Sequence, residues 1–146
     1  MDVHPTKSVR ARRAMRPPQR FTLESANRSL PLVRRIVTDI VKEYEHIAQV
    51  EARTEEATSA GRSEAVVRLR DEHANGLERL RDLSDELAQI GCELKDGEKG
   101  LVDFPAVRDG CDIYLCWRIG EERVEHWHEL DAGFAGRRRV PADFGA

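Results

Sequence analysis

Apolar residues repeat every seven positions from Leu23 to about residue 50. Two interleaved series carry this repeat: Leu23, Leu30, Val37 and Tyr44, and Ala26, Val33, Ile40 and Ile47. A repeat sustained over three heptads predicts a long amphipathic helix with a seam for a second helix. Thr22 is placed to cap its first turn, and Pro31 is expected to kink the helix or to mark a short opening helix ahead of it.

A turn and a second helical pattern follow. The sequence Thr-Ser-Ala-Gly at residues 58–61 predicts the turn, Ser63 is placed as the N-cap of the second helix, and Gly91 as its left-handed C-cap. The seam between these caps consists of Val66, Leu69, His73, Gly76, Leu80, Leu83, Leu87 and Ile90. Because two long helices joined by a short loop pack antiparallel, residues 21–91 are predicted to form a coiled-coil-like helical hairpin. A lone hairpin leaves part of each helix uncovered, so we expect a homodimer through it.

From residue 92 onward the apolar residues alternate, as they do in β-strands. The alternating segments are residues 92–95, 101–104, 111–119 and 124–130. They predict a small antiparallel sheet of three or four strands within residues 92–140, packed near one end of the hairpin as one folding unit with it. Pro105 is expected to end the second strand. The predicted fold class is therefore α+β, a long antiparallel helical hairpin followed by a small antiparallel β-sheet.

The pairing of the last two strands is predicted from the turn between them. A tight turn centred on residues 121–122 sets Trp117 opposite His126 and Leu115 opposite His128. Both imidazoles would then lie on the apolar face of the sheet, at its junction with the helices.

The composition narrows the class of protein. The chain has 146 residues, of which 40% are hydrophobic and 35% charged, and its formal net charge is −3. No apolar run approaches the roughly 18 residues of a membrane-spanning helix, and no charged-then-apolar signal peptide opens the sequence. We therefore expect a cytoplasmic protein without a membrane partner. Three cysteines cannot all pair with one another, so we expect reduced thiols that pack as small hydrophobic side chains.

Residues 1–20 form a basic segment. They hold six lysine and arginine residues against one aspartate, a net charge of +5, whereas the rest of the chain carries −8. With so few apolar residues, this segment is predicted to be a disordered arm. Such an arm would touch nucleic acid or an acidic partner; the alternative is an extension without a role. The acidic remainder argues against nucleic acid as the main partner.

Several segments of the sequence resemble one protein family. They are Phe21–Asn27 with Leu30–Val33, Glu93–Asp96, Gly100–Ala106, Tyr114–Trp117, Trp127–Leu130 and Gly133–Arg138. Taken in this order, they resemble the bacterial domain-of-unknown-function family 2203 over about residues 21–138. The resemblance implies no known activity and no catalytic residues, and the basic arm lies outside it.

His126 and His128 predict a metal site. Two histidines at positions i and i+2 of a strand point the same way, so both rings can reach one ion. A carboxylate completes a two-histidine set for Zn(II) or Fe(II) with open coordination positions, and Asp103 on a neighbouring strand is the third ligand expected. The alternative is that both imidazoles are structural and hydrogen-bond to carboxylates of the helices.

Arginines near the C-terminus predict contact with a small anionic ligand. The Gly-x-x-Gly-Arg-Arg-Arg sequence that ends at residue 139 is typical of an anion-binding turn, in which Arg137 or Arg138 orients the anion. Glu129 and Tyr114 are the further side chains expected near such a ligand. The alternative is a solvated basic segment that offsets the charge of the acidic helices.

Two functions from different classes follow from these features. In the first, the chain is a dimeric metal- or small-ligand-binding protein with its site at the sheet–helix junction, and whether it is an enzyme stays open. In the second, it is a coiled-coil interaction or scaffold protein, without a catalytic site, that works through its hairpin. The two same-facing histidines favour the first.

Overall fold

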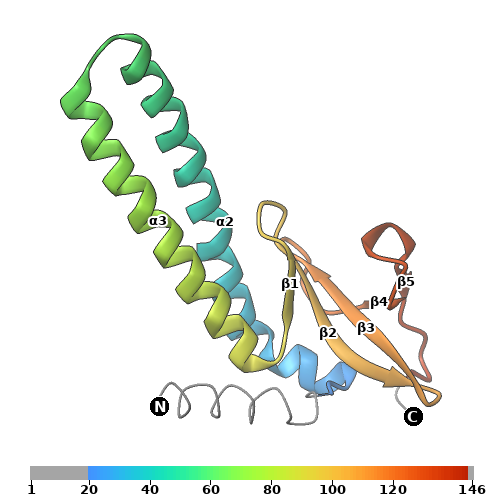
Figure 1. Cartoon of the computed structure of the whole chain (residues 1–146). Helices are drawn as coiled ribbons and strands as arrows, with labels where there is room; N and C mark the ends of the chain where they lie inside the picture. Colours follow the sequence, from blue (N-terminus) through green and yellow to red (C-terminus); the bar gives the residue numbers. More distant parts are fainter. Residues whose placement is uncertain (1–19, 145–146) are drawn as a thin grey trace, which may run out of the picture.

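The computed structural model describes residues 20–144 (Figure 1). Two helices, α2 (Leu23–Ser59) and α3 (Ser63–Ile90), are followed by five strands. The strands are β1 (Glu93–Asp96), β2 (Leu101–Arg108), β3 (Cys111–Arg118), β4 (His126–Glu129) and β5 (Arg138–Arg139), with a short 3-10 helix η1 (Phe134–Gly136) before the last. The strands form one antiparallel sheet in the order β1-β2-β3-β4-β5. The α+β prediction is confirmed, with one more strand than expected. The basic arm predicted over residues 1–20 lies outside the described residues, except for Arg20.

The helix ends are close to those predicted. Thr22 caps α2: its hydroxyl accepts the Ser25 N–H at 3.0 Å, and the Ser25 hydroxyl accepts the Thr22 N–H at 2.9 Å. Gly91 ends α3 in the left-handed conformation, with φ 112°. The N-cap of α3 was predicted one position too late, because Arg62 occupies it and Ser63 is the first helical residue.

Helix α2 continues through Pro31. A proline inside a helix removes one amide donor and crowds the preceding turn. In Figure 1 the first turns of α2, drawn in blue, run at an angle to the rest of the helix. The predicted kink is therefore present within one continuous helix.

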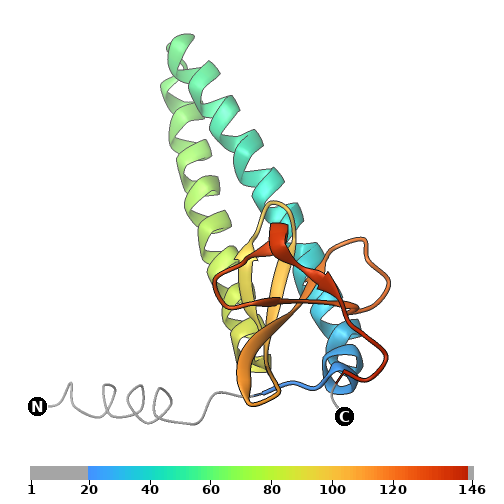
Figure 2. The ribbon, with the colours of Figure 1, turned by 90° about the vertical axis from the view of Figure 1, so that its right-hand side faces the viewer.

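The hydrophobic core lies between the hairpin, mainly α2, and one face of the sheet. Helix α2 contributes nine buried residues, whereas α3 contributes only Gly76 and Leu87. The core residues of the sheet are Val102, Phe104, Ala106, Ile113, Leu115, Trp117 and Trp127. They cover the base of the hairpin, and its distal half projects beyond the sheet (Figures 1 and 2).

Strand β2 does not stop at Pro105 but continues to Arg108, which corrects the prediction. The Pro105 carbonyl accepts the Phe21 N–H at 2.7 Å, so it points away from β3, toward the margin of the sheet beyond the end of β1. In a strand, the N–H and C=O of one residue point to the same side. The N–H that proline lacks would therefore have pointed to this margin, and no bond of the β2–β3 ladder is lost.

The pairing of β3 with β4 differs from the prediction by one residue. His126 lies opposite Cys116, and His128 lies opposite Tyr114, rather than opposite the two buried apolar residues expected. Because successive residues of a strand point to opposite faces, this shift moves both imidazoles to the other face of the sheet. The predicted position at the sheet–helix junction is therefore wrong.

The cause is the connection between the two strands, which is a loop over residues 119–125 instead of a tight turn. Asn27 of α2 holds this loop: its Oδ1 accepts the Val124 N–H at 2.8 Å, and its Nδ2 donates to the Val124 carbonyl at 3.2 Å. Arg34 also donates to the Glu122 carbonyl, at 2.9 Å. These contacts join residues far apart in sequence, so strand alternation alone does not reveal them.

Replacing Asn27 by alanine should lower the free energy of unfolding by about 2 kcal/mol, because two hydrogen bonds to the backbone of Val124 are lost. Urea denaturation followed by circular dichroism measures this change. Ser29→Ala is the control, since that hydroxyl bonds only within α2; an equal cost for Asn27→Ala and Ser29→Ala would contradict the prediction.

Candidate functional site

Polar side chains gather on the sheet face that is turned away from α2. Asp103 lies between two core residues of β2, so its side chain points to the opposite face. Across the sheet, Asp103 lies opposite Cys116, and Cys116 lies opposite His126. Tyr114 and His128 form the next pair on this face. Three central strands therefore each contribute a side chain that can ligate a metal.

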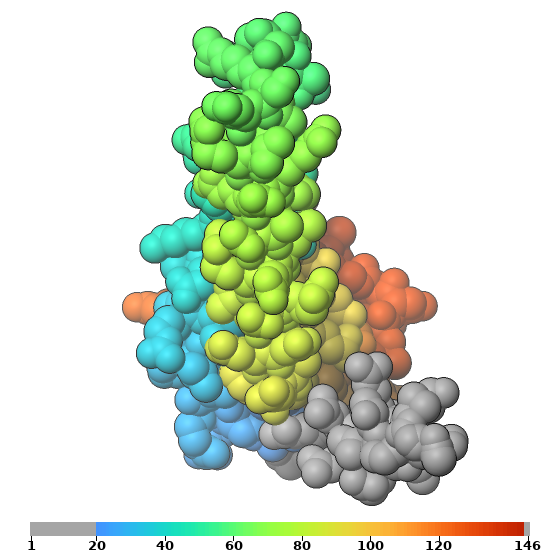
Figure 3. Space-filling model, turned by 60° about the vertical axis from the view of Figure 1, so that its left-hand side comes forward, coloured from blue at the N-terminus to red at the C-terminus, as the bar shows by residue number. Residues whose placement is uncertain are grey.

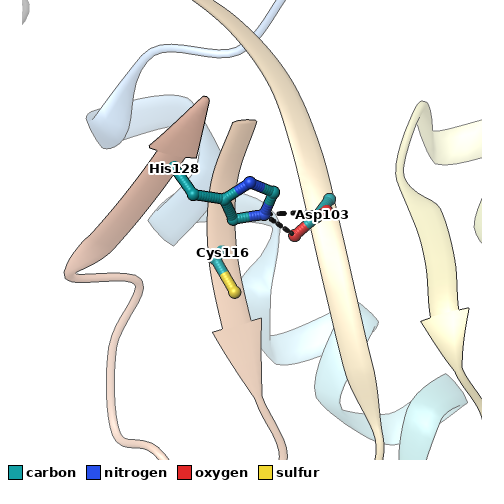
Figure 4. A group of neighbouring side chains, drawn as sticks. All are labelled: Asp103, Cys116 and His128. Carbon is teal, nitrogen blue, oxygen red and sulfur yellow. Dashed lines mark hydrogen bonds and ion pairs between the residues drawn. The ribbon is translucent and has the colours of Figure 1, made fainter. Parts of the chain in front are cut away.

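Asp103, Cys116 and His128 converge at the centre of this face (Figure 4). Their carboxylate oxygen, sulfur and ring nitrogen all lie within 4.8 Å of one another. His128 Nε2 is 3.1 Å from Asp103 Oδ1 and 3.0 Å from Oδ2. The three residues are between 1% and 4% exposed. This group combines three donor types found in protein zinc sites.

The second nitrogen of the His128 ring fixes its orientation. Nδ1 lies 2.8 Å from the carbonyl oxygen of Glu129. Since a carbonyl only accepts, Nδ1 carries a hydrogen, and Nε2 faces the Asp103 carboxylate. A proton or a metal cation can lie between Nε2 and this carboxylate. A backbone carbonyl that accepts from the non-ligating nitrogen is the usual partner of a metal-binding histidine.

Burial disfavours the charged forms of the other two side chains, Asp103 and Cys116. Loss of solvation raises the pKa of Asp103, although the neighbouring His128 and Lys95 act in the opposite direction. Burial, with a smaller contribution from Asp103, raises the pKa of the Cys116 thiol to about 12, against the effect of Arg137. Without a bound cation, Cys116 is therefore a neutral thiol at physiological pH.

The same geometry argues against a cysteine–histidine catalytic pair. A nucleophilic cysteine needs a basic ring nitrogen within hydrogen-bond reach. Both nitrogens of His128 are already engaged, one by Asp103 and one by the Glu129 carbonyl. With its raised pKa, the Cys116 thiol supplies little thiolate. Metal ligation accounts for this group better than nucleophilic catalysis does.

The segment that follows β4 folds back over the site. Arg137 Nη1 lies 3.9 Å from Cys116 Sγ and 3.2 Å from a carboxylate oxygen of Glu121. The same guanidinium stacks on the ring of Phe134 in η1, at 4.1 Å from its centroid. Burial alone would raise the pKa of Glu121, but its ion pair with Arg137 outweighs this effect and lowers it. An anion at Arg137 would have to displace Glu121.

The structure brings some of the predicted site residues together and separates others. His126 shares the face with His128, but it is outside the converging group, and its Nδ1 is buried without a hydrogen-bond partner in the described chain. Tyr114 lies beside His128, with ring centroids 5.5 Å apart, and its hydroxyl donates to Glu93 at 2.9 Å.

Glu129 and Arg138 lie away from this group. Glu129 is exposed and is paired with Ile113 of β3, so it belongs to the opposite face of the sheet. Its backbone carbonyl, and not its side chain, contacts His128. Arg138 is exposed and lies over the Trp127 ring at 5.3 Å. Of the residues expected near an anionic ligand, only Arg137 and Tyr114 border the candidate site.

Cys116 is the member of this group that sequence reasoning missed, because it was interpreted as a small buried hydrophobic residue. It is buried, but it shares its face with Asp103, which it opposes directly. The sequence does contain a signal for this position. Cys116 lies two residues after Tyr114, so both share one face of a strand whose other face is apolar. The predicted β4 register was one residue off. It set Trp127, instead of His126, opposite Cys116, and so it concealed that signal.

The three thiols should differ sharply in reactivity. Cys111 is exposed, whereas burial raises the pKa of both Cys92 and Cys116 to about 12. Brief treatment of the native, metal-free protein with iodoacetamide at neutral pH should therefore modify Cys111 alone, and denatured protein should be modified at all three. Mass spectrometry of peptides locates the labels. Rapid native labelling of Cys116 would contradict the buried site.

Comparison with known proteins identifies a family for this chain but no activity. A family model described as an uncharacterized conserved protein, DUF2203, matches residues 19–140. No curated protein and no solved structure matches the chain. Among the described residues, no helix is long and apolar enough to cross a membrane. The matched region includes both helices, all five strands and the three converging side chains. The chain therefore belongs to the DUF2203 family.

Proposed function

We propose that this protein binds one zinc ion through Asp103, Cys116 and His128. The observation that supports the proposal is the convergence of a carboxylate, a thiol and an imidazole whose Nε2 faces the carboxylate. Tetrahedral zinc with bonds of 2.0–2.1 Å to nitrogen and oxygen would hold those two atoms about 3.3 Å apart. The present separations of 3.0 and 3.1 Å need only a small adjustment to reach that value.

The donor set favours zinc over ferrous iron. A two-histidine, one-carboxylate set is typical of non-haem Fe(II), whereas a thiolate is a soft ligand that suits zinc. Replacement of one predicted imidazole by Cys116 therefore changes the expected metal from zinc or iron to zinc. Binding would also deprotonate the thiol, because the thiolate is the ligand form.

Zinc at this position would join the three central strands of the sheet. Three protein ligands leave one tetrahedral position, which water fills in an open site and a fourth side chain fills in a closed one. His126 is on the same face and its Nδ1 is unpartnered, so it is the side chain available for the fourth position. We assign no reaction to the site.

Removing a ligand should remove the metal. Protein expressed without a histidine tag should contain one zinc per chain by elemental analysis. Cys116→Ser and His128→Ala should each weaken zinc binding by at least about 100-fold in a competition titration with a chromophoric chelator. Cobalt(II) added to the metal-free wild type should give sulfur-to-metal charge-transfer absorption that Cys116→Ser abolishes.

Matched variants control this experiment. Cys111→Ser removes the exposed thiol, and His46→Ala removes a histidine of the hairpin; neither should change the zinc content. Full loss of affinity in His126→Ala would assign that ring to the fourth position, and an unchanged affinity would assign the position to water. Wild-type protein that binds no zinc, with melting unchanged by the added ion, would overturn the proposal.

We also propose that two copies associate through the helical hairpin. The distal half of the hairpin projects beyond the sheet, and α3 buries only two of its residues completely. Helices that leave this much surface uncovered are typical of bundles completed by a second subunit. Light scattering on the purified protein should give the mass of two chains, and a monomer mass would contradict this part of the proposal.

A further inference from the structure

One face of α3 is uncovered along its length. Val67 and Leu77 are 60% and 44% exposed, and Ala74 and Ala88 are also exposed. Val67, Ala74 and Ala88 follow heptad spacing, so these side chains share one stripe. We define the α3 face as Val67, Arg70, Ala74, Leu77, Arg81, Asp85 and Ala88. In Figure 3, α3 runs uncovered from the tip of the hairpin toward its base.

Two charged residues of the α3 face lie near opposite ends of the helix. Arg70 lies near its start and Asp85 near its end, with Arg81 between them. A second, oppositely directed copy of α3 alongside would set each Arg70 near an Asp85.

We infer that the α3 face of one chain packs antiparallel against the α3 face of a second copy. This inference rests on the proposed homodimer and specifies its interface. Arg70 of each chain then lies beside Asp85 of the partner subunit. Leu77, near the midpoint of the helix, meets the partner's Leu77 at the two-fold axis.

Charge selects this orientation over the parallel one. In a parallel pair each Arg70 would meet the partner's Arg70, and each Asp85 would meet the partner's Asp85, so both contacts would be repulsive. In the antiparallel pair the two-fold axis repeats the attractive contact of Arg70 with Asp85 of the partner subunit. The exposed valine, alanine and leucine side chains between these charges then become buried.

Two single charge reversals and their mixture test the inference. Arg70→Glu and Asp85→Arg should each weaken the dimer roughly 10- to 100-fold, because each places like charges opposite one another twice. Sedimentation at decreasing protein concentration measures the dissociation constant. Mixing the two variants should restore a dimer of one chain of each kind, since all four charges are then complementary. Arg68→Glu is the matched control, because that residue lies two positions earlier, about 200° around the helix, and should dissociate like the wild type.

The outcomes separate this inference from the other proposals. If the wild type is a dimer and neither reversal changes its affinity, the α3 face is not the interface. The dimer would then form elsewhere on the hairpin. Failure of the mixture to form a heterodimer would also overturn the inference. A monomeric wild type would overturn the dimer itself. Zinc content, measured on every variant, should stay at the wild-type value and reports independently on the folded metal site.

Discussion

Two hydrogen bonds between Asn27 and the backbone of Val124 hold the loop on which the position of the histidines depends. They fasten the loop after β3 to the first turns of α2, and the loop sets the register in which β4 returns. A shift of one residue would exchange Trp127 with its two histidine neighbours, putting imidazoles into the core and an indole on the polar face. The candidate zinc site and the hydrophobic core thus depend on the same contact between a helix and a loop.

Three buried side chains that can ligate a metal converge on the polar face. Asp103, Cys116 and His128 come from three successive central strands, which hold their backbones at fixed separations. Their burial disfavours charge and raises the pKa of the carboxyl and thiol groups. A divalent cation would offset that cost by stabilising the carboxylate and the thiolate.

Local sequence patterns were sufficient for most of the fold. The heptad repeat, the Thr22 cap and Gly91 define the hairpin, because helix periodicity and capping depend on neighbouring residues. The β4 register and the continuation of β2 through Pro105 were not predictable in this way. Both depend on contacts distant in sequence, from Asn27 to the loop and from Phe21 to the margin of β2. Of the residues predicted for the site, Asp103 and His128 lie together in the structure, whereas the place of Cys116 beside them appeared only when the strands were aligned.

The contact of Phe21 with Pro105 also bears on how copies of this chain can associate. Exposed strand margins invite another chain to extend the sheet, the route by which many β-rich proteins aggregate. Here one carbonyl of that margin is already occupied by the entering main chain, and the adjoining position offers no amide hydrogen. At this stretch of β2, beyond the end of β1, pairing with a strand of another molecule is thereby hindered.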